Sequence, residues 1–148
     1  MLNKEPIPRV WINGTFDVLH PGHVKLFRYA RILAGQHGKI HVGIDTDERV
    51  SLAKGPSRPV NSLSKRISNL ASTMEFDSIM SFATDTELKA LICATKPKFM
   101  VIGDDYRNKT IVGSSCIKNI FYVTRDENSS TKLITDKSLL HIPISEKV

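Results

Sequence analysis

The chain has 148 residues, of which 41% are hydrophobic and 24% charged, as expected for one soluble domain with a packed core. Its net charge of +6 and pI of about 9.4 favour an anionic partner. Because no run of five Lys or Arg occurs and only 7% of residues are aromatic, a phosphorylated small molecule is favoured over nucleic acid. The N-terminal residues lack a signal-peptide core and no apolar run could span a bilayer, so we expect a cytoplasmic protein without a membrane partner.

Strand-like and helix-like segments alternate along the chain. Residues 1–8 contain two prolines and are expected to form an irregular lead-in, followed by one domain at 9–148. Short apolar runs predict strands at 9–14, 39–45, 77–82, 99–103 and 120–124. Apolar spacing and capping residues predict helices at 21–34, 61–74, 85–95 and 129–140. The alternation predicts a single-domain α/β fold, with a parallel five-stranded sheet and helices on both faces.

Several residues mark the ends of these elements. Pro21 suits the first turn of the first helix and Gly35 its end, and Asn61 is the expected N-cap of the second helix. The segment 46–60 contains two prolines, one glycine and several cations. We expect it to be a long connection over the sheet, of the kind that often carries function.

The two cysteines, Cys93 and Cys116, do not form a Cys-x-x-Cys motif. A chain of this size in the cytosol needs no disulfide. Both residues are therefore expected to be free thiols in or near the core.

The junction of the first strand and the first helix, residues 13–23, reads Asn-Gly-Thr-Phe-Asp-Val-Leu-His-Pro-Gly-His. In an open α/β sheet, ligands bind beyond the carboxyl ends of the strands. Gly14 lets the backbone approach a ligand closely, and the N–H groups at the start of the helix favour an anion. His20 and His23 lie about one helical turn apart, so both imidazoles can donate to one phosphate. Zinc is the weaker alternative, because no third ligand has a useful spacing.

The stretch 14–23 resembles the signature of a nucleotidyltransferase superfamily whose core motif is His-x-Gly-His. The resemblance implies a Rossmann-like fold and transfer of a nucleotidyl group from a nucleoside triphosphate to a phosphate, with release of pyrophosphate. It implies that the two histidines and Lys54 act in catalysis. The residues expected to surround the phosphates are Gly14, Thr15, Phe16 and Gly22. Mg²⁺ is expected on the triphosphate, with no side-chain ligand assigned to it.

Two groups of the superfamily resemble the chain across roughly residues 9–135. They are the glycerol-3-phosphate cytidylyltransferases and the adenylyltransferases that make ADP-heptose. The segment 54–66 contains Lys-Gly and Arg-Pro-Val-Asn, as the heptose enzymes do. Its cations are expected to cover the triphosphate, with Arg66 at the nucleotide and Arg58 at the nucleotide or the acceptor.

Later segments resemble the cytidylyltransferases instead. Residues 101–106 resemble a Gly-Asp-Asp-Trp motif, and residues 123–134 resemble Arg-Thr-x-Gly-x-Ser-Thr-Thr. The residues expected at the nucleotide here are Arg125, Ser130 and Thr131. Those expected at the acceptor or the nucleotide are Asp17, Asp104, Asp105 and Tyr106. Asn128 stands where glycine is expected, and residues 74–77 replace an Arg-Tyr-Val-Asp motif, so the family's contacts at these positions do not carry over.

The main hypothesis is a cytidylyltransferase that couples CTP to a small phosphorylated alcohol, preferably glycerol 3-phosphate. The acceptor phosphate would attack the α-phosphorus in line, with no covalent enzyme intermediate. The first alternative is an adenylyltransferase that uses ATP and heptose 1-phosphate or another sugar phosphate. The others are a non-catalytic nucleotide-binding module and a basic nucleic-acid-binding domain. A homodimer is expected from the resemblance alone.

Overall fold

The computed structural model describes residues 6–124 and 133–134. The strands are β1 (Arg9–Gly14), β2 (Lys39–Asp45), β3 (Ser78–Phe82), β4 (Phe99–Gly103), β5 (Asn119–Val123) and β6 (Leu133–Ile134). The helices are α1 (Pro21–Ala34), α2 (Asp47–Lys54), α3 (Leu63–Thr73) and α4 (Asp85–Thr95). Two 3-10 turns follow β4, η1 (Asp104–Tyr106) and η2 (Ser114–Cys116). None of the helices in the described residues combines the length and apolarity needed to cross a membrane.

The sheet has the order β3-β2-β1-β4-β5-β6, and its first five strands are parallel, which confirms the predicted architecture. The short β6 runs antiparallel to β5, with Leu133 opposite Val123 and Ile134 opposite Tyr122. The predicted helix at 129–140 is therefore wrong at these two residues, where the open edge of β5 offers its backbone groups instead. The rest of that segment lies outside the described residues.

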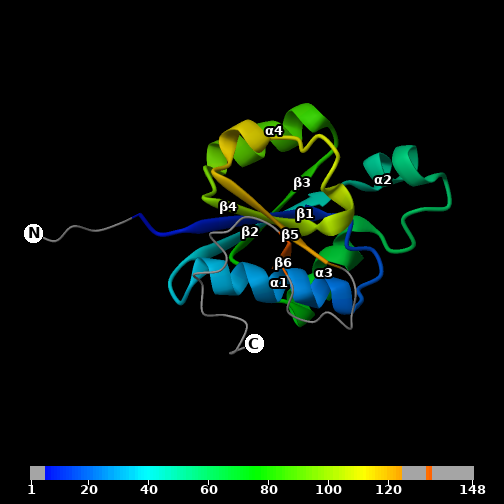
Figure 1. Cartoon of the computed structure of the whole chain (residues 1–148). Helices are drawn as coiled ribbons and strands as arrows, with labels where there is room; N and C mark the ends of the chain where they lie inside the picture. The colour runs from blue at the N-terminus through cyan, green and yellow to red at the C-terminus, as the bar shows by residue number, and fades with distance from the viewer. Residues whose placement is uncertain (1–5, 125–132, 135–148) are drawn as a thin grey trace, which may run out of the picture.

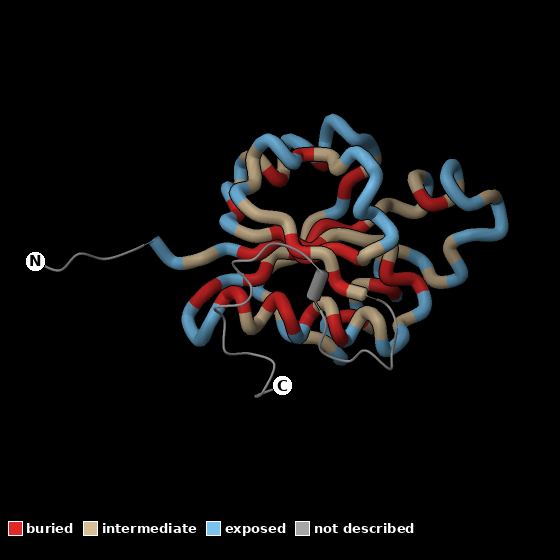
Figure 2. Tube along the Cα trace, viewed as in Figure 1, coloured by how far each residue is buried: buried red, intermediate tan, exposed pale blue. Residues whose placement is uncertain are grey.

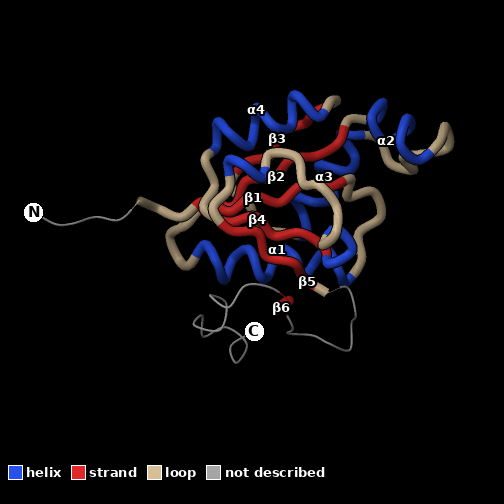
Figure 3. The backbone as a smooth tube through the Cα atoms, turned by 45° about the horizontal axis from the view of Figure 1, so that its top comes forward, coloured by secondary structure: helices blue, strands red, loops and turns tan. Residues whose placement is uncertain are grey.

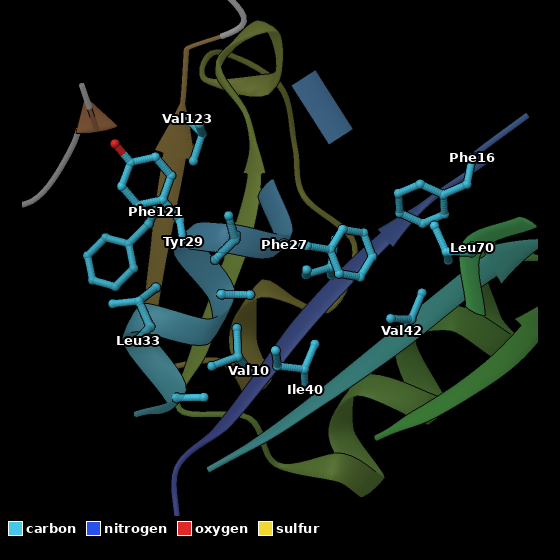
Figure 4. Close-up of a cluster of buried hydrophobic side chains, with 14 of the residues drawn as sticks. Val10, Phe16, Phe27, Tyr29, Leu33, Ile40, Val42, Leu70, Phe121 and Val123 are labelled. Atoms are coloured by element: carbon cyan, nitrogen blue, oxygen red, sulfur yellow. The ribbon is translucent and has the colours of Figure 1, made fainter. Parts of the chain in front are cut away.

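Helices cover both faces of the sheet. Figures 1 and 3 show α1 and α3 on one face and α4 on the other. Along β1 the side chains alternate: Val10 and Ile12 join the cluster beneath α1 and α3, whereas Trp11 joins the cluster beneath α4. Figure 2 shows that the buried residues follow the strands, and Figure 4 shows how Phe27 and Leu33 of α1 lie over the first cluster.

The segment 46–60 is not the continuous connection predicted from its prolines, because its first half forms α2. The Thr46 side chain accepts a hydrogen bond from the Arg49 amide at 3.2 Å, and Gly55, with φ of 105°, ends the helix. Only Val50 of this helix is buried. Figure 1 shows α2 beyond the carboxyl ends of the strands, away from the rest of the molecule.

The N-cap of α3 is Ser62, which accepts a hydrogen bond from the Lys65 amide at 3.3 Å, and not Asn61 as predicted. Asn61 instead donates its side-chain amide to the Asp17 carbonyl at 2.9 Å. A tertiary contact therefore takes the residue that local capping preferences would have used.

Cys93 of α4 and Cys116 of η2 form a disulfide, with their Cα atoms 5.1 Å apart, so the prediction of two free thiols is wrong. Close packing brings the two segments together. A Cβ atom on Gly113, just before η2, would lie 2.8 Å from Cδ1 of Ile92. Only a glycine lets the backbone approach α4 this closely, and its φ of 82° also favours glycine.

Candidate active site at the carboxyl edge of the sheet

A pocket of about 400 Å³ opens at the carboxyl edge of the sheet. From β1 the chain moves outward to β2 and β3, then returns to place β4 and β5 on the other side of β1. The crevice at such a reversal of strand order is the usual ligand site of open α/β sheets. Here Gly14 at the end of β1 and Gly103 at the end of β4 both line the pocket.

His20 and His23 line this pocket at the N-terminus of α1. Nδ1 of His20 accepts a hydrogen bond from the Gly22 amide at 3.1 Å, and Nδ1 of His23 accepts one from the His20 amide at 3.2 Å. Because both Nδ1 atoms are acceptors, Nε2 carries the proton on each neutral ring. The ring centroids lie 3.9 Å apart. The predicted pair is thus brought together as two N–H donors where the helix dipole favours an anion.

The other residues of the motif hold the histidines in place. A Cβ atom on Gly22 would lie 2.8 Å from Cε1 of His20, so this ring position requires glycine. Phe16 has a φ of 51°, an unusual backbone conformation for a residue of this size, and the residue is only 2% exposed. Its ring packs against the rings of His23 and Phe27, with centroids 5.3 and 5.7 Å away.

Asp17, in the turn between β1 and α1, forms hydrogen bonds with the loop before α3. Its two carboxylate oxygens accept hydrogen bonds from the amides of Val60 at 2.7 Å and Asn61 at 2.8 Å. Burial raises the pKa of Asp17, but these two amides and the charges of Arg66 and Arg58 outweigh it, so the net pKa is lowered. Asp17 lines the pocket as predicted, yet both of its oxygens already bind protein amides.

Arg66 lies beneath the pocket and does not line it. Its guanidinium is fully buried and donates to the carbonyls of Asn61 at 3.0 Å, Thr15 at 2.9 Å and Asp45 at 2.9 Å. It also forms a 2.6 Å ion pair with Asp47. Arg66, which was expected at the nucleotide, therefore links the loop before α3, the turn after β1, the end of β2 and the start of α2 from beneath the pocket.

The remaining predicted residues fall into four groups. Those that line the pocket, besides the residues above, are Thr15, Lys54, Arg58 and Tyr106. Asp104 and Asp105 follow β4 and do not line the pocket. Asp104 forms an ion pair with Arg107 at 3.1 Å. Outside the described residues lie Arg125, Ser130 and Thr131. Gly22 lines a small neighbouring cavity that it shares with both histidines.

Sequence reasoning missed a second half of the pocket. Asp45 at the end of β2 and Arg49 of α2 line it beside an apolar wall. The wall residues are Phe82, Leu88, Ile102, Ile111 and Val112. Asn13 also lines the pocket, and its Oδ1 accepts a hydrogen bond from Nε1 of Trp11 at 2.8 Å. The available signal was the position of Asp45, a carboxylate ending a predicted strand at the edge that carries the histidines.

Residues 11–135 match the family described as cytidylyltransferase-like. The chain belongs to this family. It is 38% identical over 128 residues to bifunctional protein HldE of Campylobacter jejuni (strain RM1221), a match that covers 86% of this chain and 27% of the relative. It is 36% identical over 132 residues to bifunctional protein HldE of Pseudomonas paraeruginosa (strain DSM 24068 / PA7), with the same coverage. The chain thus spans about a quarter of the length of these relatives.

A solved structure shares the fold of this cytidylyltransferase-like chain. The lipopolysaccharide core biosynthesis protein of Thermoplasma volcanium GSS1 aligns with a TM-score of 0.61 at 20% identity, covering 78% of this chain and 95% of that one. At this identity the likeness shows the fold alone. The family match supports nucleotidyltransferase activity, as the sequence motif predicted.

The residues of the pocket fit a metal ion that is carried mainly by the triphosphate. Within residues 6–124 and 133–134, no group of three or more His, Cys, Asp or Glu is placed to hold a metal ion by itself. Mg²⁺ in nucleotide sites takes most of its ligands from phosphate and water, with one or two carboxylates at most. Asp45 is the carboxylate of the pocket whose oxygens do not bind backbone amides.

Proposed function

We propose that this nucleotidyltransferase transfers an adenylyl group from ATP to a sugar 1-phosphate of the heptose class and releases pyrophosphate. This was the alternative hypothesis from the sequence. The relatives named HldE, 36–38% identical over most of this chain, favour it over CTP and glycerol 3-phosphate. The resemblance of segment 54–66 to the heptose enzymes favours it too.

The observation that supports the reaction class is the pair of Nε2 donors at the start of α1. In the proposed reaction an oxygen of the acceptor phosphate attacks the α-phosphorus of ATP. The bond from the α-phosphorus to the bridging oxygen breaks, and its electron pair leaves with pyrophosphate. His20, His23 and the helix N-terminus donate to the oxygens on which negative charge develops, and Lys54 and Arg58 add positive charge at the α2 side. Mg²⁺, when bound with ATP, neutralises further phosphate charge.

CTP with glycerol 3-phosphate is the second candidate. Its support was the resemblance of Asp104, Asp105 and Arg125 to cytidylyltransferase motifs. The two aspartates do not line the pocket, and Arg125 lies outside the described residues. Asp104 and Asp105 therefore add no support for this candidate from the lining of the pocket.

Pyrophosphate release tests the proposal directly. ATP and CTP, each with Mg²⁺, are crossed with heptose 1-phosphate, other sugar 1-phosphates and glycerol 3-phosphate. Release with ATP and a sugar 1-phosphate supports the proposal, and release only with CTP and glycerol 3-phosphate contradicts it.

Alanine variants of the histidines test the reaction mechanism. His20→Ala and His23→Ala are each expected to lower kcat by about 10²- to 10³-fold, because each removes one donor to developing charge. His37→Ala is the matched control, since His37 is exposed in the turn after α1 and does not line the pocket. Near-normal turnover of both histidine variants would contradict the assigned roles.

A further inference from the structure

The carboxylate of Asp45 lies next to the turn that is proposed to hold the triphosphate. Gly14 of β1 pairs with Ile44 of β2, so Thr15 and Asp45 follow at neighbouring positions of the sheet edge. One nitrogen of Arg66 donates to both of their carbonyls, each at 2.9 Å. The Asp45 side chain lines the pocket and is 19% exposed.

Arg49 holds this carboxylate in position. Its Nε lies 3.5 Å from Oδ2 of Asp45, and its Nη2 lies 2.8 Å from Oδ1 of Asp85. Its guanidinium carbon stands 5.0 Å above the centre of the Phe82 ring, and its Nη1 donates to the Ala83 carbonyl at 3.5 Å. The guanidinium is therefore fixed from several sides and orients Asp45.

A carboxylate in a pocket for phosphates is expected to bind either a cation or a hydrogen-bond donor. Burial raises the pKa of Asp45, although the charges of Arg49, Arg66 and Lys54 oppose the rise. Among the described residues, Arg49 is the only side chain that pairs with this carboxylate. Donors on a ligand would supply the hydrogen bonds that solvent no longer provides.

The pocket wall next to Asp45 and Arg49 is apolar. Phe82 at the end of β3 and Leu88 of α4 line the adjoining wall and offer no hydrogen-bonding atoms in their side chains. An acceptor seated there would bind by its apolar C–H surface and by whatever hydroxyl group reaches Asp45.

We propose that Asp45 accepts a hydrogen bond from a hydroxyl group of the phosphorylated acceptor and that Arg49 is its positioning residue. The enzyme thereby selects sugar phosphates that carry this hydroxyl over analogues in which it is replaced by hydrogen. The inference rests on the proposed function for the identity of the acceptor as a sugar phosphate. A carboxylate left without its donor penalises the deoxy analogue, as in other sites built around a substrate hydroxyl.

Calorimetric binding tests the proposal without requiring turnover. Heptose 1-phosphate and its monodeoxy analogues are titrated into the wild type, Asp45→Ala and Glu48→Ala, in the presence of Mg²⁺ and a non-hydrolysable ATP analogue. At least one analogue is expected to bind the wild type about 10-fold or more weakly than the parent, and this ratio falls toward one in Asp45→Ala. Glu48 is an exposed carboxylate on the same helix as Arg49 and serves as the matched control.

The positioning role of Arg49 has a separate readout in turnover. Arg49→Lys retains the positive charge but not the planar fork that contacts Asp45 and Asp85 together. The KM for the acceptor is expected to rise several-fold while the KM for ATP stays unchanged. Equal effects on both KM values would contradict a role through Asp45.

The outcomes separate this inference from the proposed reaction. Turnover with an equal affinity for every deoxy analogue overturns the role of Asp45 and leaves the proposed function standing. Discrimination in binding without pyrophosphate release supports Asp45 and contradicts the proposed reaction. Absence of sugar-phosphate binding contradicts both. If Asp45→Ala changes only the Mg²⁺ dependence of nucleotide binding, the carboxylate contacts the metal and the proposal is overturned.

Discussion

Replacing Arg66 by methionine should strongly destabilise the fold. Methionine keeps an unbranched apolar chain but leaves the carbonyls of Asn61, Thr15 and Asp45 without their donor. An unsatisfied buried carbonyl costs about 1 kcal/mol or more, which gives about 3 kcal/mol for the three. Loss of the ion pair with the half-exposed Asp47 adds about 0–1 kcal/mol. The expected loss is about 3–4 kcal/mol, or about 6–16 °C in Tm for a domain of this size.

Urea unfolding and thermal denaturation of Arg66→Met measure this loss, with Lys65→Met as the matched control. Lys65 is the preceding residue of α3 and is exposed, so its substitution should change the free energy of unfolding by no more than about 0.5 kcal/mol. The reasoning is refuted if Arg66→Met is as stable as Lys65→Met. Normal stability with a specific loss of ATP affinity would instead indicate that Arg66 contacts the nucleotide, as the resemblance of segment 54–66 implied.

Three further outcomes follow from contacts at and around the pocket. Asp17→Asn should lower the free energy of unfolding at pH 7 by about 1–2 kcal/mol. Since the pKa of Asp17 lies below its ordinary 3.8, its stabilisation is present above about pH 4 and lost as the pH falls through the lowered value, so urea curves of variant and wild type should converge in acid. Reducing the Cys93–Cys116 disulfide, which spans 23 residues, should cost about 3 kcal/mol in urea unfolding, and a reductant should leave Cys93→Ser unchanged. Gly22→Ala should lower kcat by displacing the His20 ring while Tm changes little, and a variant with wild-type kcat would contradict this packing argument.

The alternation of strands and helices and the position of the histidine pair were predictable because each depends on local patterns. Short apolar runs set the strands, and the motif after β1 fixes its own geometry through hydrogen bonds within residues 20–23. Helix α2 was missed because Pro56 and Pro59, just after it, indicated a loop for the whole segment 46–60. Its own signals were present, with Thr46 as N-cap and Gly55 after the last turn, but a helix with one buried residue shows no apolar stripe.

The features that sequence reasoning missed or misplaced depend on contacts between distant segments. Nothing local distinguishes a buried Arg66 from a solvent-exposed arginine that reaches a phosphate. The pairing of Cys93 with Cys116 depends on how α4 packs against the loop after η1. The position of Asp45 at the end of a predicted strand was a signal, but its place beside Thr15 follows from the pairing of β2 with β1.

The hydrogen bond between Trp11 and Asn13 makes the fluorescence of Trp11 sensitive to ligand binding in the pocket. Trp11 is the only tryptophan of the chain, its ring is fully buried, and its Nε1 contacts a side chain that lines the pocket. A ligand that draws Asn13 into a new hydrogen bond changes the polarity around a single indole. Emission from that indole should therefore change when a ligand contacts Asn13, in unlabelled protein and in real time.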